Sequence, residues 1–201
     1  AYVLRLLHET WSSKSCIYID EVGFNQWTLR TNGRSKRGTR IYTPVPTARG
    51  KNISLIMAIS TSGPVHFKVV VGSVNREKYQ EFISELVHHL PLTKHYLIHD
   101  NASIHTGIVT PNHMEVVHLP PYSPFLNPIE SVFSKLKRSV RSTLILSPGI
   151  SEMTPSQRQD LLSGLITSQI SSGDYSNLKE YYRHIKKFFP SSLIKIDING
   201  Y

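Results

Sequence analysis

Three things are scarce in this sequence: cysteine, long apolar runs, and acidic residues between Val22 and Arg76. The single cysteine, Cys16, excludes an internal disulfide framework and a cysteine-rich zinc site, and it fits a reducing compartment. No apolar run approaches the roughly 20 residues of a membrane-spanning helix, so we expect no membrane partner. A secretory signal is also absent. Because the chain starts at Ala1 rather than Met, we expect it to be a piece of a longer protein.

The remaining composition is that of a folded protein. With 39% hydrophobic and 18% charged residues, the chain does not have the composition of a disordered tail. A domain takes about 100–200 residues, so a length of 201 residues predicts one domain, alone or with an appendage.

The basic charge is concentrated in one stretch. The chain has 23 Lys and Arg against 14 Asp and Glu, which gives a net charge of +9. Between Val22 and Arg76 there are basic residues and no acid, whereas elsewhere the two signs balance. Such a stretch is expected where a protein binds nucleic-acid phosphates, and it is equally expected on a solvated face. The charge alone leaves both readings open.

The pattern of apolar residues predicts an α/β protein. β-branched and aromatic runs predict five strands, at 16–21, 52–60, 65–71, 95–100 and 115–119. Helical periodicity and helix-ending prolines predict helices at 75–89, 102–110, 127–142, 155–170 and 177–189. This order implies a mixed five-stranded sheet flanked by helices, with extra helices at the C-terminal end.

Two aspartates follow apolar runs that read as strands. Asp20 comes at the end of the first predicted strand and Asp100 at the end of the fourth. Ligands of α/β sheets bind outside the carboxyl ends of strands, so the two side chains would share a cleft if these strands are neighbours. Close carboxylates repel each other unless a cation lies between them, and Mg²⁺ or Mn²⁺ suits hard oxygen ligands. The alternative is that each aspartate only caps a turn.

Glu130 also has two readings. In the sequence Asn-Pro-Ile-Glu at 127–130, the asparagine is a natural N-cap, and the glutamate three residues later completes a capping box. On the helical wheel, however, Glu130 lies beside the apolar stripe, in line with Ser134, Lys137 and Arg141. In that position it could bind a metal ion while the two cations bind a phosphate backbone. The spacing alone does not decide between a cap and a ligand.

Three segments then occur in a recognisable order: YIDEVGF at 18–24, IHDNASIH at 98–105 and LPPYSPFLNPIE at 119–130. Together they resemble the catalytic domain of mariner-type cut-and-paste DNA transposases. The proline-rich segment that leads into Asn-Pro-Ile-Glu is the most specific of the three, and the segment Asp-Asn-Ala-x-x-His is the next. The resemblance covers about residues 11–144, and the helices after it are not matched.

The resemblance implies a ribonuclease-H-like fold in which three acids hold two divalent ions, Mg²⁺ or Mn²⁺. Carried over by motif, these acids are Asp20, Asp100 and Glu130, with 79 residues between the first two and 29 between the last two. The implied chemistry is phosphodiester hydrolysis and strand transfer on double-stranded DNA, at transposon ends and target. Because relatives work on paired ends, a homodimer is also implied.

Residues around these acids are assigned by charge and position. Asn101 and His105 would lie near the scissile phosphate or behind the metal ligands. Glu21 would face away from Asp20, because side chains alternate along a strand, and we expect it to matter little. The residues expected to bind DNA are Arg34, Lys36, Arg37, Lys137 and Arg141.

The resemblance also implies a division of the chain into domains, and it leaves other functions open. We expect a linker at 1–15, the catalytic domain at 16–145 with a basic insertion at about 26–51, and a helical extension at 146–201. The compartment would be the nucleus of a eukaryote or, otherwise, the bacterial cytoplasm. The alternatives are a domesticated transposase that binds DNA without cutting it, another nuclease of the same fold such as a ribonuclease H, and a purely structural basic domain.

Overall fold

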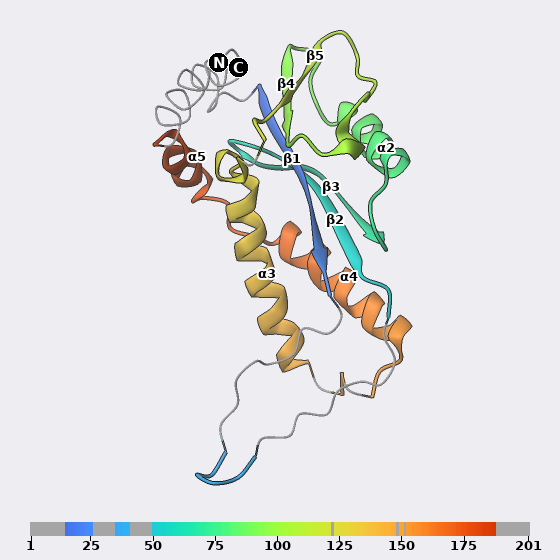
Figure 1. Cartoon of the computed structure of the whole chain (residues 1–201), viewed down its shortest axis with the longest axis vertical. Coiled ribbons are helices and arrows are strands. Elements are labelled where there is room, and N and C mark those ends of the chain that lie inside the picture. Colours follow the sequence, from blue (N-terminus) through green and yellow to red (C-terminus); the bar gives the residue numbers. More distant parts are fainter. Residues whose placement is uncertain are drawn as a thin grey trace.

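The computed structural model describes residues 15–25, 35–40, 50–121, 123–147, 149–150 and 152–187. In this part of the chain, five strands form one mixed sheet in the order β3-β2-β1-β4-β5 (Figure 1). β1 is the central strand, because it pairs antiparallel with β2 and parallel with β4. The strands are β1 (Cys16–Phe24), β2 (Ile53–Ser60), β3 (Gly63–Val71), β4 (His95–His99) and β5 (Met114–His118).

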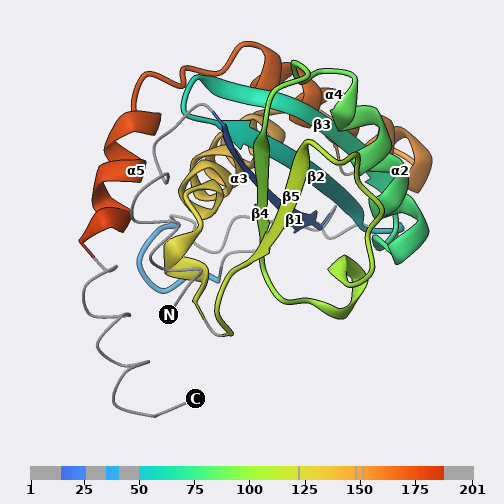
Figure 2. The same ribbon diagram turned by 90° about the horizontal axis from the view of Figure 1, so that it is seen from above.

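Helices cover both faces of this sheet (Figures 1 and 2). On one face, α2 (Arg76–Val87) packs against the sheet through its apolar side. On the other face, α3 (Ile129–Leu146), α4 (Pro155–Ser171) and α5 (Leu178–Lys186) share one core with the strands. None of these four helices in the described part of the chain is long and apolar enough to cross a membrane.

Alternation along β1 distributes its side chains between the two layers. Ile17 and Ile19 belong to the core under α2, whereas Tyr18 belongs to the core under α3, α4 and α5. By the same alternation, Asp20 faces the α3 side and Glu21 faces the α2 side. The central strand therefore carries acidic residues toward both layers at the same level.

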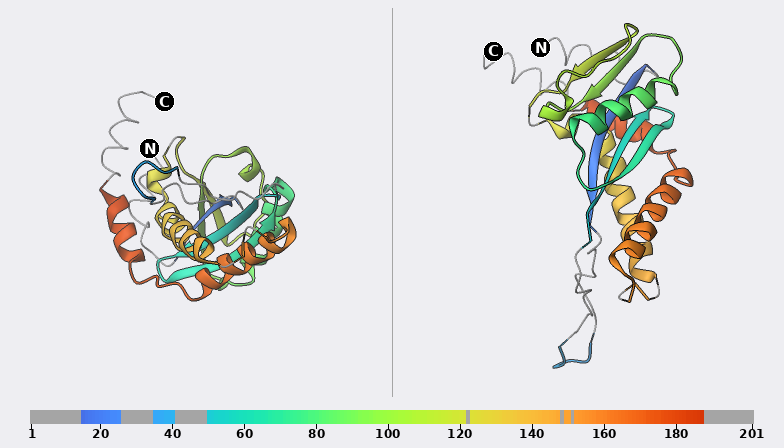
Figure 3. Two further views of the ribbon diagram at one scale, coloured as in Figure 1. Left: turned by 90° about the horizontal axis from the view of Figure 1, so that it is seen from below. Right: turned by 90° about the vertical axis from the view of Figure 1, so that its right-hand side faces the viewer.

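Local sequence accounts for the beginnings of two helices. Asn75 caps α2, since its Oδ1 accepts a 3.1 Å hydrogen bond from the Lys78 backbone N–H. Thr154 and Gln157 form a reciprocal capping box at the start of α4, and Pro155 occupies the first turn. α4 packs against α3 on the same side of the sheet (Figure 3), which joins the C-terminal helices to the main core.

The helix predicted at 102–110 is wrong. Only Ser103–His105 is helical there, as a single 3-10 turn. Thr106 is extended, and Gly107 has a positive φ of 73°, which side chains other than glycine rarely adopt. The chain therefore leaves the helical conformation directly after His105, a point that matters for the site described next.

The observed bounds of β1 and α3 also differ from the predicted ones. β1 continues to Phe24 rather than ending at residue 21, because it goes on pairing with β2 after its pairing with β4 has ended. α3 runs from Ile129 to Leu146 rather than from 127 to 142, and the proline-rich loop before it contains a 3-10 turn at Pro124–Leu126.

Candidate active site

Asp20 and Asp100 lie at the edge where the pairing of β1 and β4 ends. The parallel ladder extends as far as Tyr18 and Ile98, and each aspartate is two residues further along its chain. The two carboxylates are thus on one level, as predicted. The predicted position of Asp20 at the end of its strand is wrong, since Asp20 still pairs with Met57 of β2. The end of the parallel pairing, not the end of β1, defines this edge.

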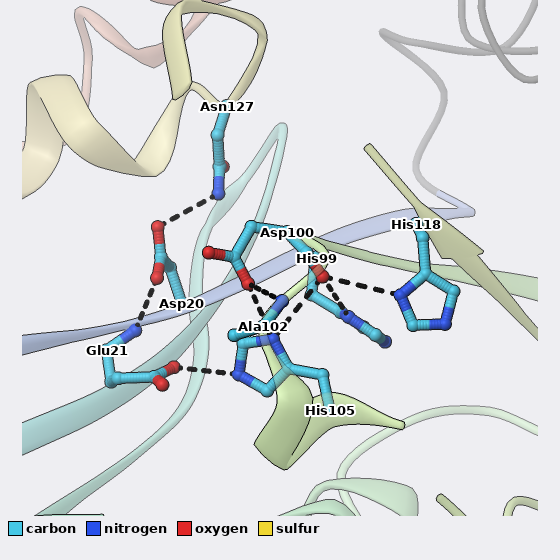
Figure 4. A network of polar contacts seen from close by, with 8 residues as sticks. All are labelled: Asp20, Glu21, His99, Asp100, Ala102, His105, His118 and Asn127. Atoms are coloured by element: carbon cyan, nitrogen blue, oxygen red, sulfur yellow. Dashed lines mark hydrogen bonds and ion pairs between the residues drawn. The ribbon is translucent and has the colours of Figure 1, made fainter. Parts of the chain in front are cut away.

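The Asp20 carboxylate is half-buried and held by two donors (Figure 4). Its Oδ1 accepts from the Glu21 backbone N–H at 2.8 Å, and its Oδ2 accepts from Asn127 Nδ2 at 3.2 Å. Burial, together with the charges of Glu21, Glu130 and Asp100, raises the pKa of Asp20 from 3.8 to about 7, against the lowering effect of the backbone hydrogen bond. A bound cation would replace this proton and favour the ionised form.

Asp100 is connected to a buried histidine. Its Oδ1 accepts from the Ala102 backbone N–H at 3.1 Å and lies 2.7 Å from His105 Nδ1. The other ring nitrogen of His105, Nε2, lies 3.0 Å from Glu21 Oε2 (Figure 4). Burial by itself would lower the pKa of His105, but the hydrogen bond to Glu21 and the charges of both carboxylates outweigh it and raise that pKa.

Other histidines hold the backbone of Asp100. His99 Nδ1 lies 3.0 Å from the Asp100 carbonyl oxygen, and His118 Nδ1 lies 3.3 Å from the same atom (Figure 4). Because a carbonyl oxygen only accepts, the His99 nitrogen must donate. Burial lowers the pKa of His99 to about 4, so this ring is neutral at physiological pH. The peptide that carries Asp100 is therefore fixed independently of its side chain.

The predicted acids meet in one cavity. Asp20, Asp100 and Glu130 all line a cavity of about 490 Å³ between the sheet edge, the proline-rich loop and the start of α3. Asn101 also lines it, whereas His105 lies behind Asp100, which agrees with a supporting role for His105. The other lining residues are Ala102, Leu119, Pro120, Pro121, Ser123, Pro124 and Asn127.

The capping box predicted at Glu130 is not formed. Pro128 occupies the N-cap position of α3, without a side-chain capping bond. The Asn127 side chain makes other hydrogen bonds: its Nδ2 donates to Asp20 Oδ2, and its Oδ1 accepts from the Ile129 backbone N–H at 3.3 Å. Glu130 is exposed and lines the cavity, so the structure shows no capping role for it.

The chemistry of the donor set suits a hard divalent cation. Three carboxylates border the cavity, and their mutual repulsion contributes to the raised pKa of Asp20. In the described part of the chain, no three His, Cys, Asp or Glu side chains are close enough together to hold a metal ion by themselves. Mg²⁺ is commonly bound by one or two carboxylates together with substrate phosphates, so further ligands from a substrate would complete such a site.

The predicted DNA-binding residues do not gather at this cavity. Arg34 lies outside the described residues. Lys36 and Arg37 are exposed in a turn at 35–40, in which the Thr39 N–H donates to the Lys36 carbonyl at 3.0 Å. On α3, Lys137 is exposed and Arg141 is half-buried. Neither of these two residues lines the cavities that contain Glu130 among the described residues.

A second cavity is lined by Glu130 together with two cations of α3. It has a volume of about 480 Å³ and shares Glu130 with the first cavity. Lys135 and Arg138 line it, one helical turn apart on α3, together with Tyr181 of α5. The helical periodicity around Glu130 does not point to these two cations, because the cavity that they share with Glu130 also involves Tyr181 of α5.

Sequence reasoning also missed the contacts that Asn127 and Glu21 make. Glu21 faces away from Asp20 as predicted, yet its contact with His105 connects it to Asp100. A signal for Asn127 was present in the Asn-Pro-Ile-Glu segment, but capping explained that residue completely. No local signal pointed to the pairing of Glu21 with His105, which are 84 residues apart.

Comparison with known families assigns the chain to one of them. A family model described as DDE superfamily endonuclease matches residues 15–147, which include Asp20, Asp100 and Glu130. The chain belongs to the DDE superfamily endonucleases. No curated protein sequence matches this DDE endonuclease chain significantly.

Solved structures share the fold. The DDE endonuclease chain matches a pre-cleavage Mos1 transpososome with a TM-score of 0.69 at 16% identity, over 96% of this chain and 59% of that one. It matches a Mos1 paired-end complex with a left transposon end with a TM-score of 0.66 at 17% identity, over 94% and 58%. The isolated catalytic domain of Mos1 mariner transposase matches with a TM-score of 0.59 at 14% identity, over 94% and 87%.

These matches settle the fold class. The mixed five-stranded sheet with its flanking helices is the predicted ribonuclease-H-like fold. The DDE endonuclease chain spans a little under 60% of the two larger transposase chains described above.

Proposed function

We propose that this chain is the catalytic domain of a mariner-type DNA transposase, which hydrolyses phosphodiesters at transposon ends and transfers the freed strands to a target. The observation that carries the proposal is the meeting of Asp20, Asp100 and Glu130 in one cavity of a DDE endonuclease fold. Likeness to structures in which Mos1 holds transposon ends supports it.

Asp20, Asp100 and Glu130 are the residues that would hold the divalent ions. Structures of Mos1 complexes have been solved with Mg and with Mn. Two bound ions would supply activation of the attacking oxygen and stabilisation of the leaving oxygen. The residues of the chain provide the rest: Asn127 and the Glu21 N–H orient Asp20, while His105 and the Ala102 N–H orient Asp100.

The DNA backbone would pass along α3. Arg138 and Lys135 border the cavity that adjoins Glu130, where they would meet phosphates on either side of the scissile bond. Lys36 and Arg37 would contact DNA farther from the chemistry. Paired transposon ends require two catalytic domains, so we propose a homodimer. The proposed compartment is the one that holds chromosomal DNA, the nucleus of a eukaryote or the cytoplasm of a bacterium.

Cleavage of supercoiled plasmid DNA in Mn²⁺ tests the proposal. The wild-type chain should nick the plasmid, and Asp100→Ala should abolish nicking while DNA binding persists. Asp160→Asn is the matched control, because Asp160 is an exposed carboxylate on α4. Binding without nicking in the wild type would favour the domesticated, non-cleaving alternative. Cleavage of only the RNA strand of an RNA–DNA hybrid would favour a ribonuclease H.

A further inference from the structure

His105 lies between two carboxylates, and both of its ring nitrogens are engaged. Nδ1 is 2.7 Å from Asp100 Oδ1, and Nε2 is 3.0 Å from Glu21 Oε2. The three side chains thus form one series of polar contacts that runs from Glu21 through His105 to Asp100 (Figure 4).

The ring is held rigidly by its surroundings. The His105 side chain is fully buried, with 0% exposure, and Glu21 is 23% exposed. The Tyr79 ring lies against His105 with centroids 4.3 Å apart, and the His99 ring meets it edge-on at 4.9 Å. Of the two carboxylates that contact the ring, Glu21 is the more buried, whereas Asp100 is half-exposed.

The position of His105 restricts the orientation of the Asp100 carboxylate. Its Oδ1 accepts a hydrogen bond from the Ala102 N–H and lies 2.7 Å from His105 Nδ1, which is also 3.4 Å from the Asp100 carbonyl oxygen. The other oxygen, Oδ2, then points toward Asp20 and the cavity that both aspartates line (Figure 4). Without His105 the carboxylate would lose one of the two contacts that restrict rotation about its terminal torsion, which is otherwise broad.

We propose that Glu21 is a positioning residue: through His105 it fixes the Asp100 carboxylate so that Oδ2 is presented to the metal and substrate. This rests on the proposed function and adds to it a residue on the opposite face of the sheet from the acids. Outer-shell partners of metal ligands typically change metal affinity 10- to 100-fold when removed. Glu21 is one step further from the ion, so we expect an effect near the lower limit.

The experiment is a double-mutant cycle read by Mn²⁺ affinity, measured by EPR of free Mn²⁺ with a saturating short DNA duplex and referred to the duplex alone, because the substrate supplies the remaining ligands. Glu21→Ala should weaken Mn²⁺ binding about tenfold, and Glu21→Gln, which keeps a hydrogen bond but not the charge, should weaken it less. In a His105→Gln background, Glu21→Ala should not weaken Mn²⁺ binding further, because Glu21 then no longer contacts Asp100 through His105. Thermal unfolding in EDTA checks that each variant is folded.

The matched control is Glu85→Ala. Glu85 Oε2 lies 3.1 Å from His66 Nε2, so this variant removes a similar carboxylate–histidine contact on the α2 side, away from the acids. Its Mn²⁺ affinity should equal that of the wild type.

The outcomes separate this proposal from the proposed function. Wild-type Mn²⁺ affinity that survives Glu21→Ala would overturn the positioning role and leave the transposase proposal intact. Equal losses for Glu21→Ala in both backgrounds would also overturn it, because Glu21 would then act independently of His105. Mn²⁺ affinity that depends on Glu21 in a chain that cuts no DNA would contradict only the proposed function. A wild-type chain with no Mn²⁺ affinity would overturn both.

Discussion

Asn127 joins the loop before α3 to the central strand, since its Nδ2 donates a 3.2 Å hydrogen bond to Asp20 Oδ2 across 107 residues of sequence. Asn127 is almost fully buried, at 3% exposure, and its Oδ1 also accepts from the Ile129 N–H. One amide thus orients an acid on β1 and starts the helix that carries Glu130. The relative placement of the first and third acids depends on this side chain.

Asn127→Ala should therefore reduce both stability and metal affinity. Loss of the buried bonds should lower the free energy of unfolding by about 1–3 kcal/mol, measured by urea denaturation. Asn177→Ala is the control, because Asn177 stands at the N-cap of α5 without a side-chain capping bond. If both variants lose the same free energy, the Asp20–Asn127 contact contributes nothing specific.

The raised pKa of Asp20 predicts how the metal-free protein responds to pH. In the folded protein Asp20 holds a proton up to about pH 7, whereas in the unfolded chain it releases the proton near pH 4. The stability that this proton contributes is fully present below about pH 4 and is lost as pH rises to 7. The loss is at most about 4 kcal/mol.

Urea unfolding in EDTA at several pH values measures this loss. Asp20→Asn cannot titrate, so the difference in unfolding free energy between wild type and Asp20→Asn should shift in favour of the variant as pH rises from 4 to 7. Adding Mn²⁺ should restore the wild type at neutral pH, because a cation stabilises the ionised carboxylate. A difference that stays constant with pH would show that Asp20 is ionised throughout.

Glu130→Gln should abolish most DNA cleavage while it changes the stability of the fold little. The structure shows no capping box, so only the favourable charge in the first turn of α3 is lost, which is worth about 0.3–1 kcal/mol. Plasmid nicking in Mn²⁺ should nearly vanish, since one hard ligand of the cavity is removed, while duplex binding persists. Glu152→Gln, at an exposed carboxylate, should nick at the wild-type rate. Near-normal nicking by Glu130→Gln would remove Glu130 from the ligand set.

Arg138→Ala should weaken duplex binding more than Lys137→Ala. Both residues are exposed on α3, but only Arg138 borders the cavity that contains Glu130. Loss of one phosphate contact should reduce the slope of log affinity against log salt by about 0.9. Fluorescence anisotropy of a labelled duplex between about 50 and 200 mM salt measures it. Equal slopes for the two variants would place the DNA elsewhere.

Much of the fold could be predicted from the sequence because it depends on local periodicity. The strand of β1 and the apolar stripe of α3 are visible in the order of residues, although the position of Asp20 within β1 was predicted wrongly. The error at 102–110 arose because one 3-10 turn followed by an extended Thr106 and a glycine at positive φ has no clear signature in composition.

The site was less predictable, and Asn127, Glu21 and Arg138 show why. In the sequence, Asn127 can be explained as a helix cap, Glu21 as a residue on the other face of the sheet, and Arg138 as one more cation on a basic helix. In the structure, Asn127 contacts Asp20, Glu21 contacts His105, and Arg138 lines a cavity with Tyr181. All three partners come from distant parts of the chain.

By itself, the sequence determined the elements and the three acids that the family match contains, because periodicity and motif are properties of neighbouring residues. Only the tertiary structure decided that Glu21 reaches Asp100 through the buried His105 ring and that the Asn127 side chain donates to Asp20. The parallel pairing of β1 with β4 and the packing of α3 bring these residues together, and hydrogen bonds a few ångströms long form only after that packing is complete.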